Sequence, residues 1–156
     1  MIMFTHTVPI GLFADESSPN LLDQLWTSLV HKAENPVGYV PAITEAKVVE
    51  RYSDGFLREI LVRDELRYRE RVTLVPRERV VFDQLDDPLH SLITNELGQG
   101  ADGGFTYTLC VTLSPAGLAR TQQDPGFLVA SDTIFYDTAR ASANTLRLTA
   151  LMFQAA

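Results

Sequence analysis

The residues best suited to chemistry lie in residues 66–74, LRYRERVTL, where two faces alternate along the chain. Alternation with a period of two is typical of a strand that has one covered face. Three arginines share one face and need water, so Tyr68 and Glu70 lie on the covered face. A carboxylate on an apolar wall is costly unless it is paired or borders a hollow. This segment therefore predicts a sheet with a polar site on its inner face.

Partners for this carboxylate come from the preceding strand of the hairpin. When the apolar faces of the two strands coincide, Arg58 lies opposite Glu70. Ile60 then lies opposite Tyr68. We therefore expect an ion pair between Arg58 and Glu70 on the inner face.

The loop before this hairpin decides whether a second carboxylate joins the pair. A three-residue loop at residues 53–55, with its glycine in the left-handed conformation, places Glu50 opposite Arg58. A two-residue Asp-Gly turn would instead bring Arg51 opposite Arg58, and such a like-charge pair is unfavourable. We therefore expect a ladder of Glu50, Arg58 and Glu70 across three strands.

Two roles are open for this ladder. One is a buried ion network that fixes strand register. The other is a site in which Glu70, Tyr68 or Arg58 anchors a ligand or moves a proton as a general acid or base. A charge-paired Glu70 is a weak base, which favours positioning by a cavity over proton transfer.

The elements that must position these residues follow from the rest of the pattern. The first eleven residues predict a strand. Ser18 as N-cap and Pro19 at the first helical position predict the start of a helix that ends by Asn35, and a turn or helical piece follows at residues 37–40. Six short strands joined by tight turns then indicate an antiparallel meander. They are predicted at residues 43–52, 56–63, 66–75, 79–85, 90–97 and 105–113.

A polar connection at residues 114–126 leads to a long helix from residue 127 to about residue 154. Its periodicity separates an inner stripe of small and apolar side chains from an outer polar stripe. Small residues on the inner stripe suit either close backbone packing or one wall of a cavity. The inner stripe comprises Ile134, Phe135, Thr138, Ala141, Ser142, Thr145, Leu148 and Met152, and the outer one Asp137, Arg140, Asn144 and Arg147.

Size and composition restrict the class of protein. The 156 residues suit a single domain, which we place at residues 1–156. A net charge of −7 argues against nucleic acid or an anionic membrane as the partner. Cys110 is the one cysteine and suits the reducing cytoplasm. The N-terminus resembles neither a signal peptide nor a membrane span. We therefore expect a cytoplasmic protein.

Motifs of the common cofactor and metal sites are missing from the sequence. It has no phosphate-binding loop, dinucleotide fingerprint, nucleophile elbow or paired CxxC. His6, His31 and His90 lack the spacing of metal ligands. We expect neither a cofactor nor a metal.

The order of strand, helix pair, six-strand meander and long C-terminal helix resembles the helix-grip arrangement of the START-like (Bet v 1-like, SRPBCC) superfamily. Within it, residues 25–43 and the segments VVERYSDGFLREILV and YRERVTLVPRERVVF resemble the AtaL-like family. That family is named for a protein of the acetylaranotin biosynthetic cluster. The spacing of Trp26, Lys32-Ala33, Asn35-Pro36 and Pro41 is the most specific part.

This resemblance covers about residues 4–113 and implies an α+β fold. A curved antiparallel sheet would wrap around the C-terminal helix and enclose an apolar cavity, with its mouth near the strand-connecting loops and residues 114–126. The sequence does not decide which faces of strands 79–85 and 90–97 line this cavity. The further expected ligand-binding residues are Glu50, Tyr107, Phe105, Ile60, Trp26, Ile134, Thr138, Ala141 and Thr145.

Relatives in the superfamily bind sterols, lipids or polyketides, some cyclise polyketides, and some bind client proteins. The resemblance therefore implies a hydrophobic small molecule as the partner, and the oligomeric state stays open. One hypothesis is a cofactor-independent cyclase or isomerase acting on a polyketide-like or peptide-derived intermediate. The alternatives are a non-catalytic lipid or metabolite carrier and a client-protein binder that uses the outer arginine face. Fold alone does not decide between them.

Overall fold

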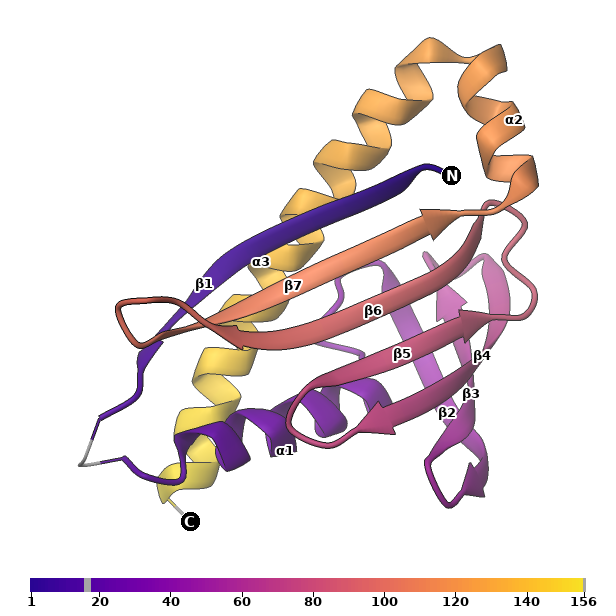
Figure 1. The fold of residues 1–156 in the computed structure, drawn as a ribbon. Helices are drawn as coiled ribbons and strands as arrows, with labels where there is room; N and C mark the ends of the chain where they lie inside the picture. Colours follow the sequence, from indigo (N-terminus) through magenta and orange to yellow (C-terminus); the bar gives the residue numbers. More distant parts are fainter. Residues whose placement is uncertain (16–17, 156) are drawn as a thin grey trace.

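The computed structural model describes residues 1–15 and 18–155. One antiparallel sheet of seven strands, in the order β1-β7-β6-β5-β4-β3-β2, dominates this part of the chain (Figure 1). The elements are β1 (Met3–Phe13), α1 (Leu21–Glu34), β2 (Ile43–Tyr52), β3 (Gly55–Val62), β4 (Leu66–Val75), β5 (Arg79–Gln84), β6 (His90–Gln99), β7 (Gly104–Leu113), α2 (Pro115–Gln123) and α3 (Pro125–Ala155).

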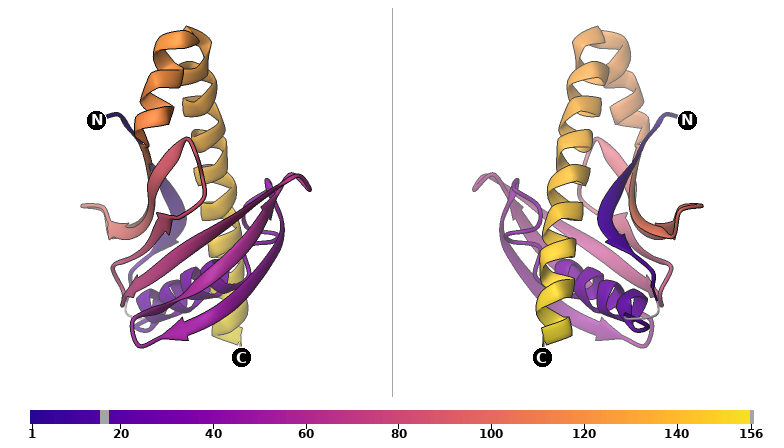
Figure 2. Two further views of the ribbon diagram at one scale, coloured as in Figure 1. Left: turned by 90° about the vertical axis from the view of Figure 1, so that its right-hand side faces the viewer. Right: turned by 90° about the vertical axis from the view of Figure 1, so that its left-hand side faces the viewer.

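The sheet curves around α3, which packs against β1, β7 and α1 (Figure 2). The α1 helix lies beside the C-terminal half of α3, whereas α2 and the start of α3 extend past the end of the sheet (Figure 1). Burying one face of a sheet against helices is how such a layer removes its apolar side chains from water. This arrangement confirms the predicted α+β helix-grip fold.

The buried face of α1 shows why this helix packs where it does. Leu21, Leu25, Leu29 and Lys32 recur at spacings of three or four residues and are all buried. The leucines join Val72, Phe82 and other core residues of the sheet. One position of this buried stripe is thus occupied by an amine.

The meander between β2 and β7 follows the sequence prediction within two residues at every strand end. β1 continues to Phe13, past the predicted end. α1 ends at Glu34, immediately before Asn35, as expected. Residues 37–40 form a turn, in which the Val40 amide donates to the Pro36 carbonyl over 3.0 Å.

Two predictions about helix starts are wrong. The α1 helix begins at Leu21 with Asn20 as its cap, so Ser18 is not the N-cap. Residue 17, also expected near this start, lies outside the described residues. The polar connection at 114–126 contains α2, whose N-cap Ser114 accepts a hydrogen bond from the Gly117 amide over 3.0 Å. A serine before a proline therefore starts a helix here, where proline at the first turn loses no hydrogen bond.

The predicted inner stripe of α3 is also partly wrong. Ile134, Leu148 and Met152 are 45%, 49% and 70% exposed. α1 and β1 pack against α3, and most of the side chains that α3 buries lie outside the predicted stripe. The buried residues of α3 are Ser131, Ala139, Ser142, Ala143, Leu146 and Ala150, and of these Ser142 was predicted to face inward. The outer stripe is confirmed for Asp137, Arg140 and Asn144, whereas Arg147 is half-buried.

Candidate functional site

A cavity of about 360 Å³ lies between the inner face of the sheet and α3. Side chains from α1, β2 to β7 and α3 line it, and most of them are apolar. The exposed lining residues Arg63, Leu66 and Ile134 mark its mouth, beside the β3–β4 turn and the first half of α3. The predicted cavity is therefore present. Its mouth lies at strand-connecting loops as expected, but α2 does not line it.

The predicted ion pair between Arg58 and Glu70 lies on the cavity wall. The two residues face each other in the β3–β4 register, and Arg58 Nε donates to Glu70 Oε1 over 2.7 Å. Both are almost fully buried, at 5% and 2% exposure. Arg58 Nη1 also donates to the Ala33 carbonyl over 2.9 Å, and Gln84 Nε2 donates to Glu70 Oε2. Both carboxylate oxygens are therefore engaged.

The third member of the expected ladder is wrong, because Glu50 is exposed and outside the cavity. The turn has two residues, so Glu50 pairs with Leu57, and a bulge between Val48 and Glu50 then places Val48 opposite Arg58. The turn is Ser53-Asp54, with Tyr52 paired to Gly55. Gly55 is needed for space rather than for a left-handed conformation, since a Cβ there would lie 1.9 Å from the Val72 carbonyl oxygen.

A second cation, Lys32, completes this end of the cavity, and the sequence analysis did not assign it a role. The residue is 5% exposed, and its Nζ donates to Asn95 Oδ1 over 2.6 Å. Burial lowers the pKa of Lys32 to about 7, with repulsion from Arg58 acting the same way and Glu70 opposing it. Its signal in the sequence was a lysine at an apolar position of the α1 stripe.

Phe82 lies beside both cations. The Arg58 guanidinium carbon is 4.5 Å from the centroid of the Phe82 ring, and Lys32 Nζ is 5.8 Å from it. Phe82, Gln84 and Asn95 all line the cavity. The inward faces of β5 and β6, which the sequence left open, are therefore those that carry these three residues.

Tyr107 forms the floor beside Lys32, whose Nζ lies 5.7 Å from the centroid of the Tyr107 ring. The tyrosine is fully buried, and its hydroxyl forms no hydrogen bond with any described residue. Burial raises the pKa of Tyr107 far above its usual range, and the nearby Ser142 hydroxyl opposes this effect. A buried hydroxyl on a cavity wall, with only the Ser142 hydroxyl nearby, is available to a ligand.

A second polar cluster lies near the mouth. His90 Nδ1 is 2.7 Å from Asp87 Oδ2, and the His90 ring packs edge-on against Phe135 with 5.5 Å between ring centroids. Burial alone would raise the pKa of Asp87, but hydrogen bonds from His90 and from two backbone amides outweigh it and lower this pKa. Burial and the Asp87 charge raise the pKa of Tyr68. The sequence analysis considered His90 only as a metal ligand and gave Asp87 no role.

The structure separates the expected binding residues into two groups. Those that line the cavity are Arg58, Ile60, Tyr68, Glu70, Tyr107, Ile134 and Thr138. Those that do not are Glu50, Phe105, Trp26, Ala141 and Thr145. Phe105 and Trp26 pack in the core beyond the cavity, and Thr145 Oγ1 donates to the Ala141 carbonyl within α3 over 3.1 Å.

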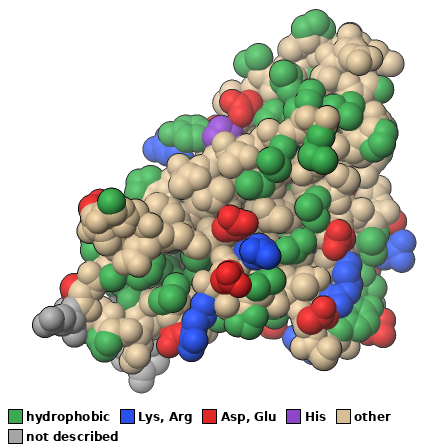
Figure 3. Space-filling view, viewed as in Figure 1, with side chains coloured by type: hydrophobic (Ala, Val, Ile, Leu, Met, Phe, Trp, Pro, Cys, Tyr) green, Lys and Arg blue, Asp and Glu red, His purple; other side chains and the backbone are tan. Residues whose placement is uncertain are grey.

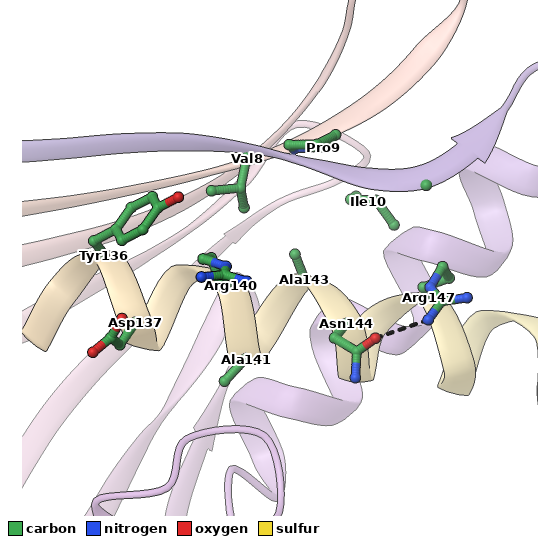
Figure 4. Close-up of a pocket in the computed structure, with 11 residues that line it drawn as sticks. Val8, Pro9, Ile10, Tyr136, Asp137, Arg140, Ala141, Ala143, Asn144 and Arg147 are labelled. Carbon is green, nitrogen blue, oxygen red and sulfur yellow. Dashed lines mark hydrogen bonds between the residues drawn. The ribbon is translucent and has the colours of Figure 1, made fainter.

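Ala141 is among the residues that line a different hollow, an open groove of about 800 Å³ between β1 and α3 (Figure 4). Its rim carries Asp137, Arg140 and Asn144, and Arg147 donates to the Asn144 side chain over 2.8 Å. These polar groups are exposed or half-buried, so water can satisfy them. The groove therefore lacks the enclosed, convergent polar groups of the cavity.

No group of three or more His, Cys, Asp or Glu side chains among the described residues could hold a metal ion. No helix in this part of the chain is both long and apolar enough to cross a membrane.

Comparison with known proteins gives one family and many similar folds. Residues 5–128 match the family described as acetylaranotin biosynthesis cluster protein L. No curated protein matches the sequence. At the sequence identities given below, similarity to solved structures shows the fold alone.

Three solved structures illustrate this likeness. TTHA0849 from Thermus thermophilus has a TM-score of 0.64 at 12% identity, over 97% of this chain and 99% of that one. The Zhui aromatase/cyclase from a Streptomyces species has a TM-score of 0.60 at 15% identity, over 96% and 93%. The di-domain aromatase/cyclase StfQ from the steffimycin pathway has a TM-score of 0.62 at 15% identity, over 99% of this chain. The chain spans 52% of StfQ.

Proposed function

We propose that this chain, which belongs to the family described as acetylaranotin biosynthesis cluster protein L, binds a hydrophobic small molecule in its cavity and acts on it as a cofactor-independent cyclase or isomerase. The observation that carries the proposal is a mostly apolar cavity of about 360 Å³ with two polar clusters on its wall. Pockets of this volume and character hold small organic ligands. The aromatase/cyclase names of two structures with this fold support the reaction class.

The two polar clusters, one around Arg58 and the other around His90, suit the two requirements of a carbonyl condensation or isomerisation. A base must remove a proton next to a carbonyl group, and a cation must stabilise the resulting enolate oxygen. We assign the base to His90: when its Nδ1–H donates to Asp87, Nε2 carries the free lone pair. Tyr68, whose pKa is raised beside Asp87, would donate the returning proton.

Arg58 would stabilise the enolate oxygen, because it lines the cavity as a buried cation. Glu70 takes a different role from the acid or base considered in the sequence analysis. Its two oxygens already accept hydrogen bonds from Arg58 and Gln84. We therefore assign Glu70 to holding Arg58 in place rather than to proton transfer.

Binding is tested by filling the cavity. Thr138→Trp should abolish the fluorescence increase of 1-anilinonaphthalene-8-sulfonate, because Thr138 lines the cavity. Thr133→Trp is the matched control, since Thr133 is exposed five residues earlier on the same helix. Native mass spectrometry of freshly purified protein should also show a co-purified small molecule. A folded Thr138→Trp protein that binds the probe like the wild type would overturn the proposed ligand site.

Proton transfer is tested with a bicyclic ketone, 2-tetralone, in deuterated buffer. Nuclear magnetic resonance should show hydrogen exchange next to the carbonyl group, slowed by about 10²-fold in His90→Asn. The control is His6→Asn, because His6 forms a similar pair with Asp132 at 2.7 Å but lies outside the cavity lining. Equal rates in His90→Asn and the wild type would remove His90 as the base.

The carrier hypothesis keeps one observation in its favour. Arg58, Glu70 and Gln84 satisfy one another without a ligand, as a purely structural network would. Binding of the fluorescent probe together with no ketone exchange above buffer would favour a carrier.

A further inference from the structure

Lys32 is a buried amine whose contacts differ from those of a structural lysine. Its Nζ donates to the neutral amide oxygen of Asn95, and no carboxylate of the described residues forms an ion pair with it. Buried lysines are costly as cations unless they are paired. Lys32 also lines the cavity between the rings of Phe82 and Tyr107. The amine is therefore positioned towards a ligand space rather than within a salt bridge.

The charged groups around Lys32 favour its neutral form. Arg58, on β3, repels a second cation, while Glu70, on β4, attracts it but is already engaged with Arg58 and Gln84. The contacting residues on β5, β6 and β7 are Phe82, Asn95 and Tyr107, which carry no charge there. A pKa near 7 leaves a large fraction of Lys32 unprotonated at neutral pH.

We propose that Lys32 bonds covalently to a carbonyl carbon of the ligand and that the ligand class is a 1,3-dicarbonyl compound. The proposal rests on the proposed function, because the cavity must be the ligand site. A neutral amine in an apolar pocket is the usual nucleophile for this chemistry. The Arg58 guanidinium, which contacts the same Phe82 ring, would face the second carbonyl oxygen.

The chemical step needs no oxidant or reductant. The Lys32 nitrogen attacks one carbonyl carbon, a C–N bond forms, and the π electrons move to oxygen, which takes up the proton released from nitrogen. Loss of water breaks the C–O bond and gives an imine. A proton then moves from the carbon between the two carbonyl positions to nitrogen, which gives an enaminone. The balance is amine plus diketone to enaminone plus one water.

The chain allows a clear test because it has two lysines, Lys32 and Lys47, besides its N-terminal amine. Incubation with 1-phenyl-1,3-butanedione should increase the mass of the protein by the mass of this diketone minus one water. Peptide mapping should place this adduct on Lys32, with the near-ultraviolet absorption of an enaminone. Lys32→Met should lose the adduct. Lys47→Met should keep it, because Lys47 is exposed on β2 and outside the cavity.

A second variant covers the case in which Lys32→Met fails to fold. Lys32→Arg keeps the positive charge but cannot lose its proton near neutral pH, so it should also form no adduct. The position of the adduct in the wild-type protein can be mapped whether or not either variant folds. Adduct only on Lys47 or the N-terminus, or no adduct in wild-type protein, would overturn the proposal.

A non-reactive analogue separates this failure from failure of the proposed function. The corresponding alcohol, 1-phenyl-1,3-butanediol, cannot react but has the same skeleton. If the diol displaces 1-anilinonaphthalene-8-sulfonate and the diketone forms no adduct, the cavity binds ligands and the covalent role of Lys32 is wrong. If neither compound displaces the fluorescent probe, the ligand site itself is wrong.

Discussion

The inner and outer faces of the β3–β5 part of the sheet carry similar ion pairs in opposite surroundings. On the inner face, Arg58 and Glu70 are 2.7 Å apart with side chains 6% and 2% exposed. On the outer face, Arg69 and Asp86 are 2.9 Å apart with side chains 56% and 35% exposed. The distances are nearly equal, so geometry does not distinguish the pairs. The difference is that water can replace either partner only on the outer face.

The outer arginines offer little support for binding of a client protein. Arg67, Arg69 and Arg71 each pair with a carboxylate, at 3.4, 2.9 and 2.6 Å. On the face of the molecule drawn in Figure 3, basic and acidic side chains lie side by side rather than in one basic patch. Exposed pairs of this kind contribute little to stability. The inner pair, by contrast, is almost fully buried, so little water can take the place of a lost partner.

The largest effect should come from breaking the inner pair. Arg58→Ala leaves the Glu70 carboxylate buried with Gln84 as its remaining partner. We expect a loss of about 3–5 kcal/mol in the free energy of unfolding, because the remaining charge is uncompensated. Urea denaturation measures this loss. Unfolding of Arg58→Ala near the wild-type midpoint would show that burial does not distinguish the two faces.

Lys32 tests the same effect of burial through the pH dependence of the protein's stability. Between pH 7 and 10.5 the unfolded chain binds more protons at Lys32 than the folded chain, so the stability of the wild type rises with pH in this window. The cost of burying the charge is present in full below about pH 7. Lys32→Met removes that cost, so its stability relative to the wild type should fall by about 2 kcal/mol between pH 7 and pH 9.

Denaturation of both proteins at the two pH values measures this difference. Loss of the hydrogen bond to Asn95 shifts the stability of Lys32→Met equally at both, so only the change with pH reports on the amine. A difference that does not depend on pH would show that Lys32 keeps an ordinary pKa.

Glu70→Gln separates structure from chemistry in the inner pair. The amide keeps the volume and one acceptor for Arg58 but loses the charge, so we expect a stability loss of about 1–2 kcal/mol. The rate of 2-tetralone exchange, corrected for folded protein, should stay near that of the wild type. A fall of about 10²-fold in this rate, with unchanged binding of the fluorescent probe, would instead make Glu70 the base.

Patterns of alternating residues were sufficient to predict the meander and the pairing of Arg58 with Glu70. Side chains on a strand face one side or the other, so covering one face fixes the register. The bulge near Glu50 could not be predicted in this way, because one extra residue shifts every later side chain. The Ser53-Asp54 turn, shorter than the predicted loop, already pairs Glu50 with Leu57 and so removes Glu50 from the site.

The remaining site residues depend on packing between distant elements. Lys32, on α1, meets Asn95, on β6, only after the sheet has curved around the helices. The buried face of α3 depends in the same way on how α1 and β1 press against it. The start of α2, by contrast, follows from a local pattern that the sequence analysis did not use: Ser114 is the N-cap and a proline follows it.

The smallest effect should come from the outer pair, and it completes the comparison with Arg58→Ala. Arg69 donates two hydrogen bonds to the Asp86 carboxylate, at 2.9 and 3.0 Å, so its geometry is at least as good as that of the inner pair. Arg69→Ala should nevertheless lower the melting temperature by less than about 2 °C, because water solvates Asp86 once the arginine is gone.

Differential scanning calorimetry at low and high salt measures this effect. The small difference between wild type and Arg69→Ala should shrink further at about 1 M salt, where charges are screened within about 3 Å. The inner pair should keep most of its contribution under the same conditions, since salt does not enter the buried cluster. A melting temperature of Arg69→Ala as low as that of Arg58→Ala would mean that hydrogen-bond geometry, and not exclusion of water, determines the strength of these pairs.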